Sequence, residues 1–448
     1  MADLTYRRNR ELIRLLSQLR WSPERLAKEV NEAVGSQQAI NSTTPYHWRD
    51  RGRVPREPYG RVVCEVLSRA TGTPVAYEQL WQRRDGVGPR SLDIPLVEAA
   101  WTPEAALAAL SLAAERVVSL HKPGDVLSTA ALHTAGRRWA DPSVRPPAGE
   151  GRLRIGEPQL ADLRLTVRSK ARVDAAYGGG LVRDPLREEA RFALQLLQYG
   201  RYDPETGARL YAAAADLARL AGWASFDCGE HAAAQRFLLA GLRLAHVSGD
   251  RALGARILGC LGVQATYIAD AGDAVALLAS AIEGGGEELP PAERALLYGR
   301  LARARAGLGD AEAARTAADQ GFAALAGAGP GSGAEEDAAE LHGLVGETLL
   351  LISDPEAAAG HLDRAVAELG PARARSRALL LVRLAEARLR LGRAEEAGRA
   401  AEQARALDVG MRSPRVTAAL AEYRRRVART PGADRPAPSV PAARRTTR

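Results

Sequence analysis

An alanine recurs at nearly constant spacing through the C-terminal half of the chain, between residues 205 and 426. Five segments align there, and each has a pair of small residues, then a loop rich in Gly or Asp, then the alanine at a fixed offset. Small residues that recur in this way let two antiparallel helices approach closely, and each helical hairpin can then stack on the next. The pattern predicts a continuous solenoid of about five hairpins. The alanines are Ala234, Ala274, Ala314, Ala358 and Ala397, at intervals of 40, 40, 44 and 39 residues.

The composition indicates an all-α fold. Hydrophobic residues make up 46% of the 448 residues and aromatic residues only 5%, and the apolar content is mostly Ala and Leu, which favours closely packed helices. No apolar run reaches the length of a bilayer, and no apolar stretch follows the first charged residues, so we expect neither a transmembrane helix nor a signal peptide. The three cysteines, Cys64, Cys228 and Cys260, are far apart, which argues against a disulfide framework or a zinc site and indicates a cytoplasmic protein.

Residues 8–84 are predicted to form a first domain of short helices. The second of these helices begins with Ser22 as N-cap and Pro23 at the first helical position, and Gly35 is a natural stop. Its apolar spacing points three residues toward the core: Leu26, Ala27 and Val30. In the helix before it, four leucines share one face: Leu12, Leu15, Leu16 and Leu19.

A third helix is predicted from Thr44-Pro45 to about Gly52, because the same cap-then-proline order recurs and Pro55 forbids continuation. Two successive helices in this order are typical of a helix-turn-helix, whose second helix presents its N-terminal residues to base edges in the major groove. Trp48 is expected to anchor this helix in the core. Arg49 could offer two N–H groups to a guanine, or pair with a phosphate. The residues predicted to bind DNA are Thr43, Thr44, Tyr46, His47, Arg49, Arg51, Arg53 and Arg56.

Two features leave another interpretation open. The connection GSQQAIN (residues 35–41) is longer than the three- or four-residue turn of the motif, so either the turn carries an insertion or the second helix runs further. An Arg-rich helix in an Arg-rich protein can also be a solvated surface. The alternative is therefore a scaffold or adaptor protein that binds no DNA and whose N-terminal unit is degenerate.

The distribution of charge favours the DNA-binding interpretation. Residues 1–90 carry 16 basic and 10 acidic side chains, and residues 412–448 carry 10 and 2, which leaves a net charge of −6 for the residues between them. Two basic ends around a mildly acidic middle are expected when a nucleic-acid-binding end is joined to a scaffold. The scarcity of lysine means that the arginine excess could equally reflect a GC-rich genome.

Segments rich in Gly and Pro divide the rest of the chain. We predict a linker with connecting helices over residues 85–158, the helical repeat domain over residues 159–426, and a disordered basic tail over residues 427–448. The YGGG sequence at 177–180 follows no recognisable strand and lacks the Lys-Ser/Thr of a phosphate-binding loop. It is interpreted as a flexible joint before the solenoid.

The repeat resembles the tetratricopeptide repeat, with a unit somewhat longer than the usual 34 residues. The proline that commonly ends such a repeat is missing, which leaves the helix ends open. The positions that match the motif are Leu261-Gly262, Gly309, Ala314, Gly392 and Ala397.

The combination of domains resembles a known group of regulators. The HWRDRGRVP ending of the third helix resembles Cro/repressor-like domains, and residues 174–180 and 220–259 are similar to large actinobacterial (Streptomyces-type) transcriptional regulators that join a helix-turn-helix to tetratricopeptide repeats. The resemblance implies a regulator of development, such as sporulation, or of secondary metabolism, acting on double-stranded DNA at the nucleoid. Because a small DNA-binding domain gains affinity by pairing half-sites, we expect a homodimer.

No pattern of catalytic or metal-binding residues stands out. The seven histidines form no ligand pair with a carboxylate motif, no serine lies in a GxSxG sequence, and no cysteine has a nearby histidine. We therefore expect no enzymatic activity, no metal and no cofactor. Trp223 and Phe226 begin the array at its most aromatic point. Core packing is the simpler interpretation, and the alternative is that they line the solenoid groove and bind a protein, peptide or small molecule.

Overall fold

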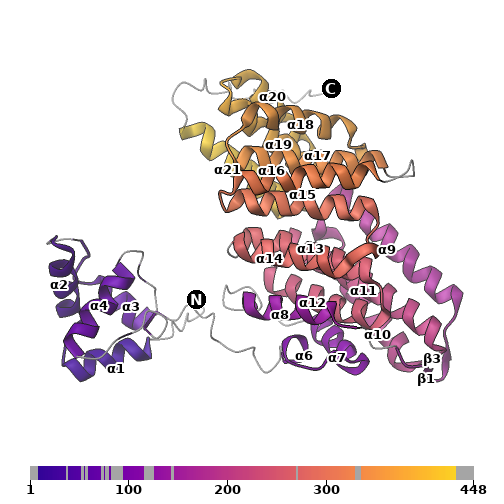
Figure 1. Cartoon of the computed structure of the whole chain (residues 1–448), viewed down its shortest axis with the longest axis horizontal. Helices are drawn as coiled ribbons and strands as arrows, with labels where there is room; N and C mark the ends of the chain where they lie inside the picture. Colours follow the sequence, from indigo (N-terminus) through magenta and orange to yellow (C-terminus); the bar gives the residue numbers. More distant parts are fainter. Residues whose placement is uncertain are drawn as a thin grey trace, which may run out of the picture. The chain divides into compact units, whose positions relative to one another are not determined.

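The computed structural model describes residues 9–36, 39–51, 55, 59–71, 75, 80–81, 94–115, 126–142, 146–268, 271–327 and 334–429. The chain divides into two compact units, residues 1–88 and residues 89–448 (Figure 1). No helix within these described ranges is long and apolar enough to cross a membrane. The predicted tail at 427–448 falls outside the described residues from 430 onward.

The first unit is a small helical domain. Its elements are α1 (Arg10–Leu19), α2 (Pro23–Val34), α3 (Thr44–Arg51) and α4 (Tyr59–Thr71). The predicted start and stop of α2 are confirmed: the Ser22 side chain accepts a hydrogen bond from the Arg25 backbone, and Gly35 ends the helix with φ 71°. Three of the four leucines predicted to face the core in α1 are buried, and Leu19 is half-buried. The core of the unit is formed by Leu12, Leu15, Leu16, Leu26, Ala27, Val30, Ile40, Trp48, Val63, Cys64, Val66, Leu67, Leu80 and Trp81.

The second unit contains five helical hairpins in sequence, each formed by two neighbouring helices that pack on one another. All five repeated alanines are fully buried, as their spacing predicts. The pairs are α11 (Pro204–Asp227) with α12 (His231–Ser248), α13 (Arg251–Ile268) with α14 (Ala271–Gly285), α15 (Pro291–Gly307) with α16 (Ala311–Ala326), α17 (Ala334–Leu351) with α18 (Pro355–Glu368), and α19 (Ala374–Arg390) with α20 (Ala394–Asp408). Short 3-10 helices η5 (Gly286–Glu288) and η6 (Pro371–Arg373) join hairpins, and α21 (Pro414–Arg429) follows the last.

Glycine makes the close approach within these hairpins possible. A Cβ atom on Gly222 would lie 2.7 Å from Leu238 Cγ, and one on Gly262 or Gly346 would lie 2.6 Å from Cγ of Leu278 or Leu362. Each leucine is 16 residues after its glycine, so the same contact recurs in three hairpins. The expectation that small residues let the paired helices pack closely is confirmed.

Within the predicted linker and connecting helices of residues 85–158, the structure describes three helices. They are α6 (Ile94–Val97), α7 (Pro103–Ala114) and α8 (Thr129–Ala140), and their apolar residues belong to the main core of the second unit. The buried Arg243 of α12 donates three hydrogen bonds of 2.9–3.0 Å, to the carbonyl of Leu96 in α6 and to those of Ala99 and Ala100 just after it. A polar side chain inside an array helix therefore fixes the end of α6.

The second unit also contains a small three-stranded sheet. Sequence reasoning predicted only helices and missed this sheet. Strands β1 (Gly149–Glu150) and β2 (Leu153–Arg154) flank β3 (Gly200–Tyr202) in the order β1-β3-β2. Strands β1 and β2 lie near the end of the predicted linker and connecting helices (residues 85–158), and β3 follows α9 (Glu157–Tyr177), η4 (Gly179–Leu181) and α10 (Arg183–Tyr199).

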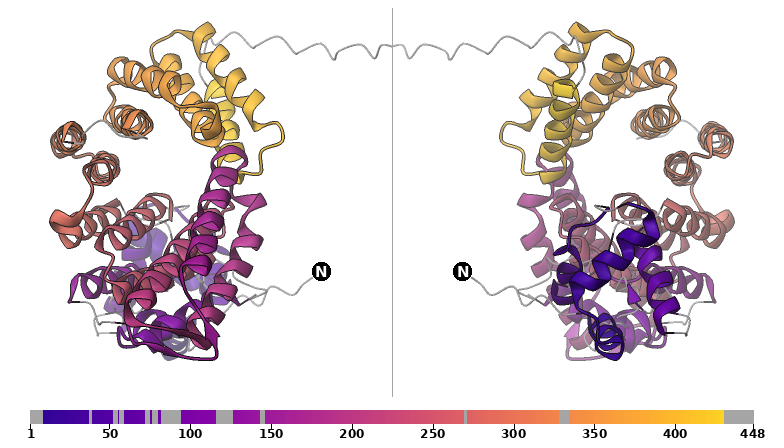
Figure 2. Two further views of the ribbon diagram at one scale, coloured as in Figure 1. Left: turned by 90° about the vertical axis from the view of Figure 1, so that its right-hand side faces the viewer. Right: turned by 90° about the vertical axis from the view of Figure 1, so that its left-hand side faces the viewer.

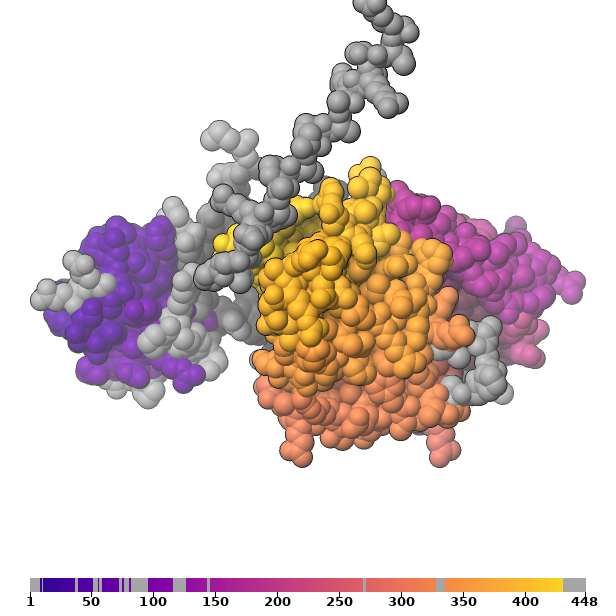
Figure 3. Space-filling view, turned by 90° about the horizontal axis from the view of Figure 1, so that it is seen from above, coloured from indigo at the N-terminus to yellow at the C-terminus, as the bar shows by residue number. Residues whose placement is uncertain are grey.

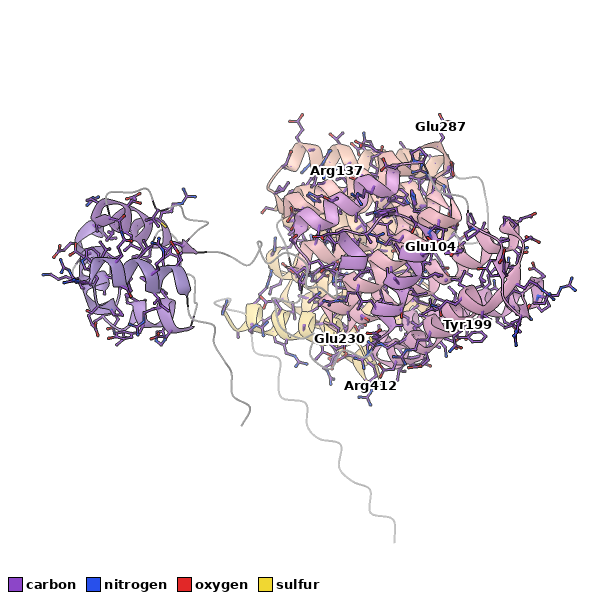
Figure 4. The ribbon with its side chains drawn as sticks, turned by 90° about the horizontal axis from the view of Figure 1, so that it is seen from below. Glu104, Arg137, Tyr199, Glu230, Glu287 and Arg412 are labelled. Atoms are coloured by element: carbon purple, nitrogen blue, oxygen red, sulfur yellow. The ribbon has the colours of Figure 1, made fainter. Side chains whose placement is uncertain are left out.

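The last helices of the second unit return to its first long helix. Helix α19 and η6 contact α9, and the Arg412 backbone N–H donates to the Tyr177 carbonyl at 2.7 Å. In Figure 2 the yellow C-terminal segment meets the end of the magenta helices, and in Figure 3 the surfaces of these segments meet. The Gly180 N–H in turn donates to the carbonyl of Arg412, which is labelled in Figure 4.

The interpretation of residues 177–180 as a flexible joint is wrong. Gly178 has φ 88°, and a Cβ atom on it would lie 2.8 Å from both the Arg412 carbonyl oxygen and Ser413 Cβ. A Cβ on Gly179 would overlap the backbone of Ala224. The glycines are required because three segments of backbone pass one another here without room for a side chain.

Two histidines of one hairpin are neighbours in the structure. His342 of α17 and His361 of α18 lie with their Nδ1 atoms 2.8 Å apart, beside the ring of Phe322. Burial and the nearby Arg364 lower the pKa of His342 to about 4, and the same two causes lower the pKa of His361. No group of three or more potential metal ligands occurs among the described residues.

This pair predicts a loss of stability in mild acid. Between the pKa of an unfolded histidine, about 6.5, and the lower folded value, the unfolded chain binds more protons, so the free energy of unfolding falls as the pH is lowered. We expect the guanidinium midpoint, followed by circular dichroism, to fall from pH 7 to pH 5. The fall should be smaller in His342→Gln, which does not titrate, and an equal fall in both proteins would contradict the assignment.

Candidate nucleic-acid interface

Helix α3 is held against the first unit by one face. Pro45 and Trp48 are buried, and the Trp48 ring meets the Trp81 ring edge-on with centroids 5.8 Å apart. Trp81 donates from Nε1 to the Gly60 carbonyl at 2.7 Å, which fixes the second ring against α4. The prediction that Trp48 anchors α3 is confirmed.

The other side of α3 carries the described residues predicted to bind DNA. Thr43 is exposed just before the helix, and Thr44, Tyr46, His47 and Arg49 are each half-buried along it. Arg51 is the last residue of α3, but its side chain lies outside the described part of the structure, as do Arg53 and Arg56. The structure therefore brings the described candidates together on one short helix and on the residue just before it.

The long connection before α3 is tied to α2 by one side chain. Asn31 donates from Nδ2 to the Ile40 carbonyl at 3.0 Å and accepts from the Ile40 N–H at 2.8 Å, so its amide pairs with that backbone as a neighbouring strand would. The Ile40 side chain is buried in the core of the unit. Helix α2 ends at Gly35 as predicted, so the extra length lies in the connection and not in a longer α2. The hydrogen bonds between Asn31 and Ile40 hold this connection in place, so that α3 packs against α2.

Removal of the Asn31 side-chain amide should make the connection and α3 open more often, and so exchange amide hydrogens faster. Asn31→Ala leaves the partly buried N–H and carbonyl of Ile40 without these partners, at a cost of about 1–3 kcal/mol. We expect peptides spanning residues 39–51 to exchange amide hydrogens at least about tenfold faster. Glu32→Ala is the matched control, because Glu32 lies next to Asn31 on α2 but is exposed and forms a surface ion pair with Lys28, so its loss should leave the exchange unchanged. Equal exchange in the two variants would show that Asn31 does not hold the connection.

A second asparagine joins three segments of the unit. Asn9 caps α1 by accepting from the Leu12 N–H, donates from Nδ2 to the Leu80 carbonyl at 2.8 Å, and donates from its backbone N–H to the Arg49 carbonyl at 2.7 Å. Sequence reasoning missed both Asn9 and Asn31. An N-cap position before an acidic first turn could have indicated Asn9, but nothing in the sequence pairs Asn31 with Ile40.

Two acidic side chains contact the candidate DNA-binding residues. The Tyr46 hydroxyl donates to the Glu24 carboxylate, which lowers the pKa of Glu24 and raises that of Tyr46. The Arg49 guanidinium donates from Nε and Nη2 to the two carboxylate oxygens of Asp50, at 3.0 and 2.6 Å. Neither acid was predicted to take part, and together they orient the side chains of Tyr46 and Arg49.

Trp223 and Phe226 do not form an open partner surface. Phe226 is only 3% exposed, and the Trp223 ring is half-buried, 5.4 Å from Phe226. Arg415 covers both rings, and Arg375 lies over Trp223. The prediction of a partner site fails for Phe226, because the returning end of the array packs over it, and the core-packing interpretation fits both residues.

Beneath these aromatic rings lies a buried set of charges, here called the closing cluster: Asp174, Asp227, Arg375, Ser413 and Arg415. Arg375 binds Asp174 with two contacts of 3.0–3.1 Å, and its Nη1 is 3.5 Å from Asp227. Asp227 also accepts from the Gly179 N–H and the Ser413 hydroxyl, each at 3.0 Å. Burial raises the pKa of Asp174, against the effect of Arg375. The cluster connects α9 and α11 to α19 and the start of α21.

Comparison with known proteins concerns only the first unit. A family model described as the SP15 N-terminal domain matches residues 12–80, from the first turn of α1 to Leu80. No curated protein matches the chain. The matched range includes α2, the connection through Ile40, and α3, so these parts belong to one segment that resembles a domain found in other proteins.

Proposed function

We propose that this protein is a sequence-specific transcriptional regulator that binds double-stranded DNA through α3, with α2 and α3 acting as a helix-turn-helix. The observation that carries the proposal is the arrangement of α3. Pro45 and Trp48 hold it in the core, while Thr43, Thr44, Tyr46, His47 and Arg49 follow one another along its accessible side. A helix that is anchored by one face and polar on the other can enter a major groove without unfolding its domain.

The array is proposed to be a tetratricopeptide-like solenoid used for dimerisation or for binding a partner or signal. Its five hairpins with recurrent Gly–Leu contacts support that comparison. A homodimer would place two copies of α3 on paired half-sites and multiply their affinities. Control of development or secondary metabolism follows from the resemblance described above, and the nucleoid is the corresponding place of action.

The test is selection of bound duplexes from a random pool by the full-length protein, followed by binding to the selected duplex. We expect a defined consensus, and we expect Arg49→Ala/Arg51→Ala to lose affinity for it by at least about tenfold. The matched control is Arg399→Ala/Arg405→Ala, which removes two exposed arginines from α20. Recovery of no consensus would reject the proposal and favour the adaptor alternative.

A further inference from the structure

On the basis of the proposed DNA-binding function, we infer that Arg49 reads the O6/N7 edge of a guanine, and that Asp50 and Tyr46 are the residues that position it for this. The sequence leaves two roles open for Arg49, a base contact or a phosphate contact. The geometry around its guanidinium distinguishes them.

Asp50 occupies one of the two hydrogen-bonding edges of the guanidinium. It accepts from Nε and Nη2, which form the side edge of the planar group. The end edge, formed by Nη1 and the second N–H of Nη2, remains, and no described residue accepts a hydrogen bond from Nη1. Two parallel N–H groups on one edge match the two acceptors that guanine presents in the major groove.

Tyr46 fixes the plane of the guanidinium. The Arg49 Cζ atom lies 4.9 Å from the centre of the Tyr46 ring, and the ring is held from α2 because its hydroxyl donates to Glu24. The side chains of Arg49 and Asp50 are 29% and 33% exposed, so the pair is accessible but partly shielded from water. The end edge therefore has a set direction before DNA arrives, which reduces the entropy lost on binding.

The charge of Asp50 favours a base over a phosphate. Arg49 and Asp50 together carry no net charge, so the pair gains little from neutralising a phosphate, and a phosphate would approach a second anion. The guanine edge is uncharged and meets no such repulsion. A bidentate contact of this kind discriminates against the wrong base by about 1–3 kcal/mol, or roughly 5- to 150-fold in affinity.

The experiment uses the full-length protein and its selected duplex, with single guanines replaced by 7-deazaguanine or inosine. 7-Deazaguanine lacks the N7 acceptor, whereas inosine keeps both O6 and N7 and serves as the matched control. At one guanine we expect 7-deazaguanine to weaken wild-type binding about tenfold and inosine to leave it unchanged. Arg49→Ala should be insensitive to 7-deazaguanine at that position.

The salt dependence of binding separates the two roles of Arg49. Loss of a phosphate contact reduces the slope of log affinity against log salt by about 0.9 per subunit, so Arg49→Ala should leave this slope unchanged. Asp50→Asn frees the arginine charge, so it should bind random duplex more tightly, with a slope steeper by about 0.9. It should also discriminate less between guanine and 7-deazaguanine. An unchanged circular dichroism spectrum and melting temperature would show that Asp50→Asn remains folded.

Three results would overturn the inference, and they differ from failure of the proposed function. If the wild type selects a consensus but Arg49→Ala reduces the salt slope by about 0.9, Arg49 contacts a phosphate. If no guanine shows a 7-deazaguanine effect that depends on Arg49, it does not read guanine. If Asp50→Asn discriminates like the wild type, Asp50 does not position the arginine. If the wild type selects no consensus at all, the DNA-binding function itself is wrong.

Discussion

Asp227→Ala is expected to lower the free energy of unfolding of the second unit by about 3–5 kcal/mol, the usual cost of removing one partner from a buried ion pair. The Asp227 carboxylate is fully buried and accepts from Gly179 and Ser413 while facing Arg375 and Arg415. Without it, Arg415 loses its buried counter-ion, and Arg375 retains only Asp174.

Guanidinium unfolding followed by circular dichroism measures this loss. The control is Asp363→Ala, because Asp363 forms an exposed ion pair with Arg388, and such pairs contribute about 0–1 kcal/mol. If both variants lose the same small amount, the closing cluster does not hold the array together. Amide exchange should also rise around η4 and residues 409–413 in Asp227→Ala, because both segments depend on that carboxylate.

Trp139→Ala should lower the free energy of unfolding by about 3–5 kcal/mol, because it removes a large buried side chain and leaves a cavity between α8 and the array. The Trp139 ring, 1% exposed, packs onto Gly254 and Gly284, where any Cβ atom would overlap it. Its carbonyl oxygen also contacts Nδ1 of the buried His246 and accepts from Arg251.

The comparison is Tyr199→Ala, since the Tyr199 side chain is 66% exposed and its loss should change the free energy of unfolding by about 0.5 kcal/mol or less. Chemical unfolding of the two variants under identical conditions gives the difference. A similar small effect for both would show that packing of α8 on the array contributes little to the stability of the second unit.

Features with a local cause were predictable from the sequence. The repeated alanines mark the hairpins because small residues at a regular interval have a direct steric meaning. The caps at Ser22 and Thr44-Pro45 predicted the starts of α2 and α3 because a helix terminus needs its own hydrogen-bond partners. These signals placed α2 and α3 at the positions where the structure has them.

Features that depend on distant partners were not predictable. Asp174 and Arg375 are 201 residues apart, and no periodicity relates them. The three glycines at 178–180 therefore suggested a joint, although Gly178 and Gly180 are crowded by the turn before α21 and Gly179 by the backbone of Ala224 in α11. Likewise, the role of Asn31 depends on its hydrogen bonds to the backbone of Ile40. The orientation of the Arg49 side chain depends on its contacts with Tyr46 and Asp50, and these contacts form only in the folded chain.

The most direct test of the DNA-binding function is the affinity of the full-length protein for its selected duplex and for a shuffled duplex of equal length and composition. Fluorescence anisotropy at about 150 mM salt would suppress most non-specific attraction. A regulator that reads bases through α3 should prefer the selected duplex by about 1,000-fold or more. Affinities that agree within a few-fold would contradict the account and show that this unit does not read DNA sequence.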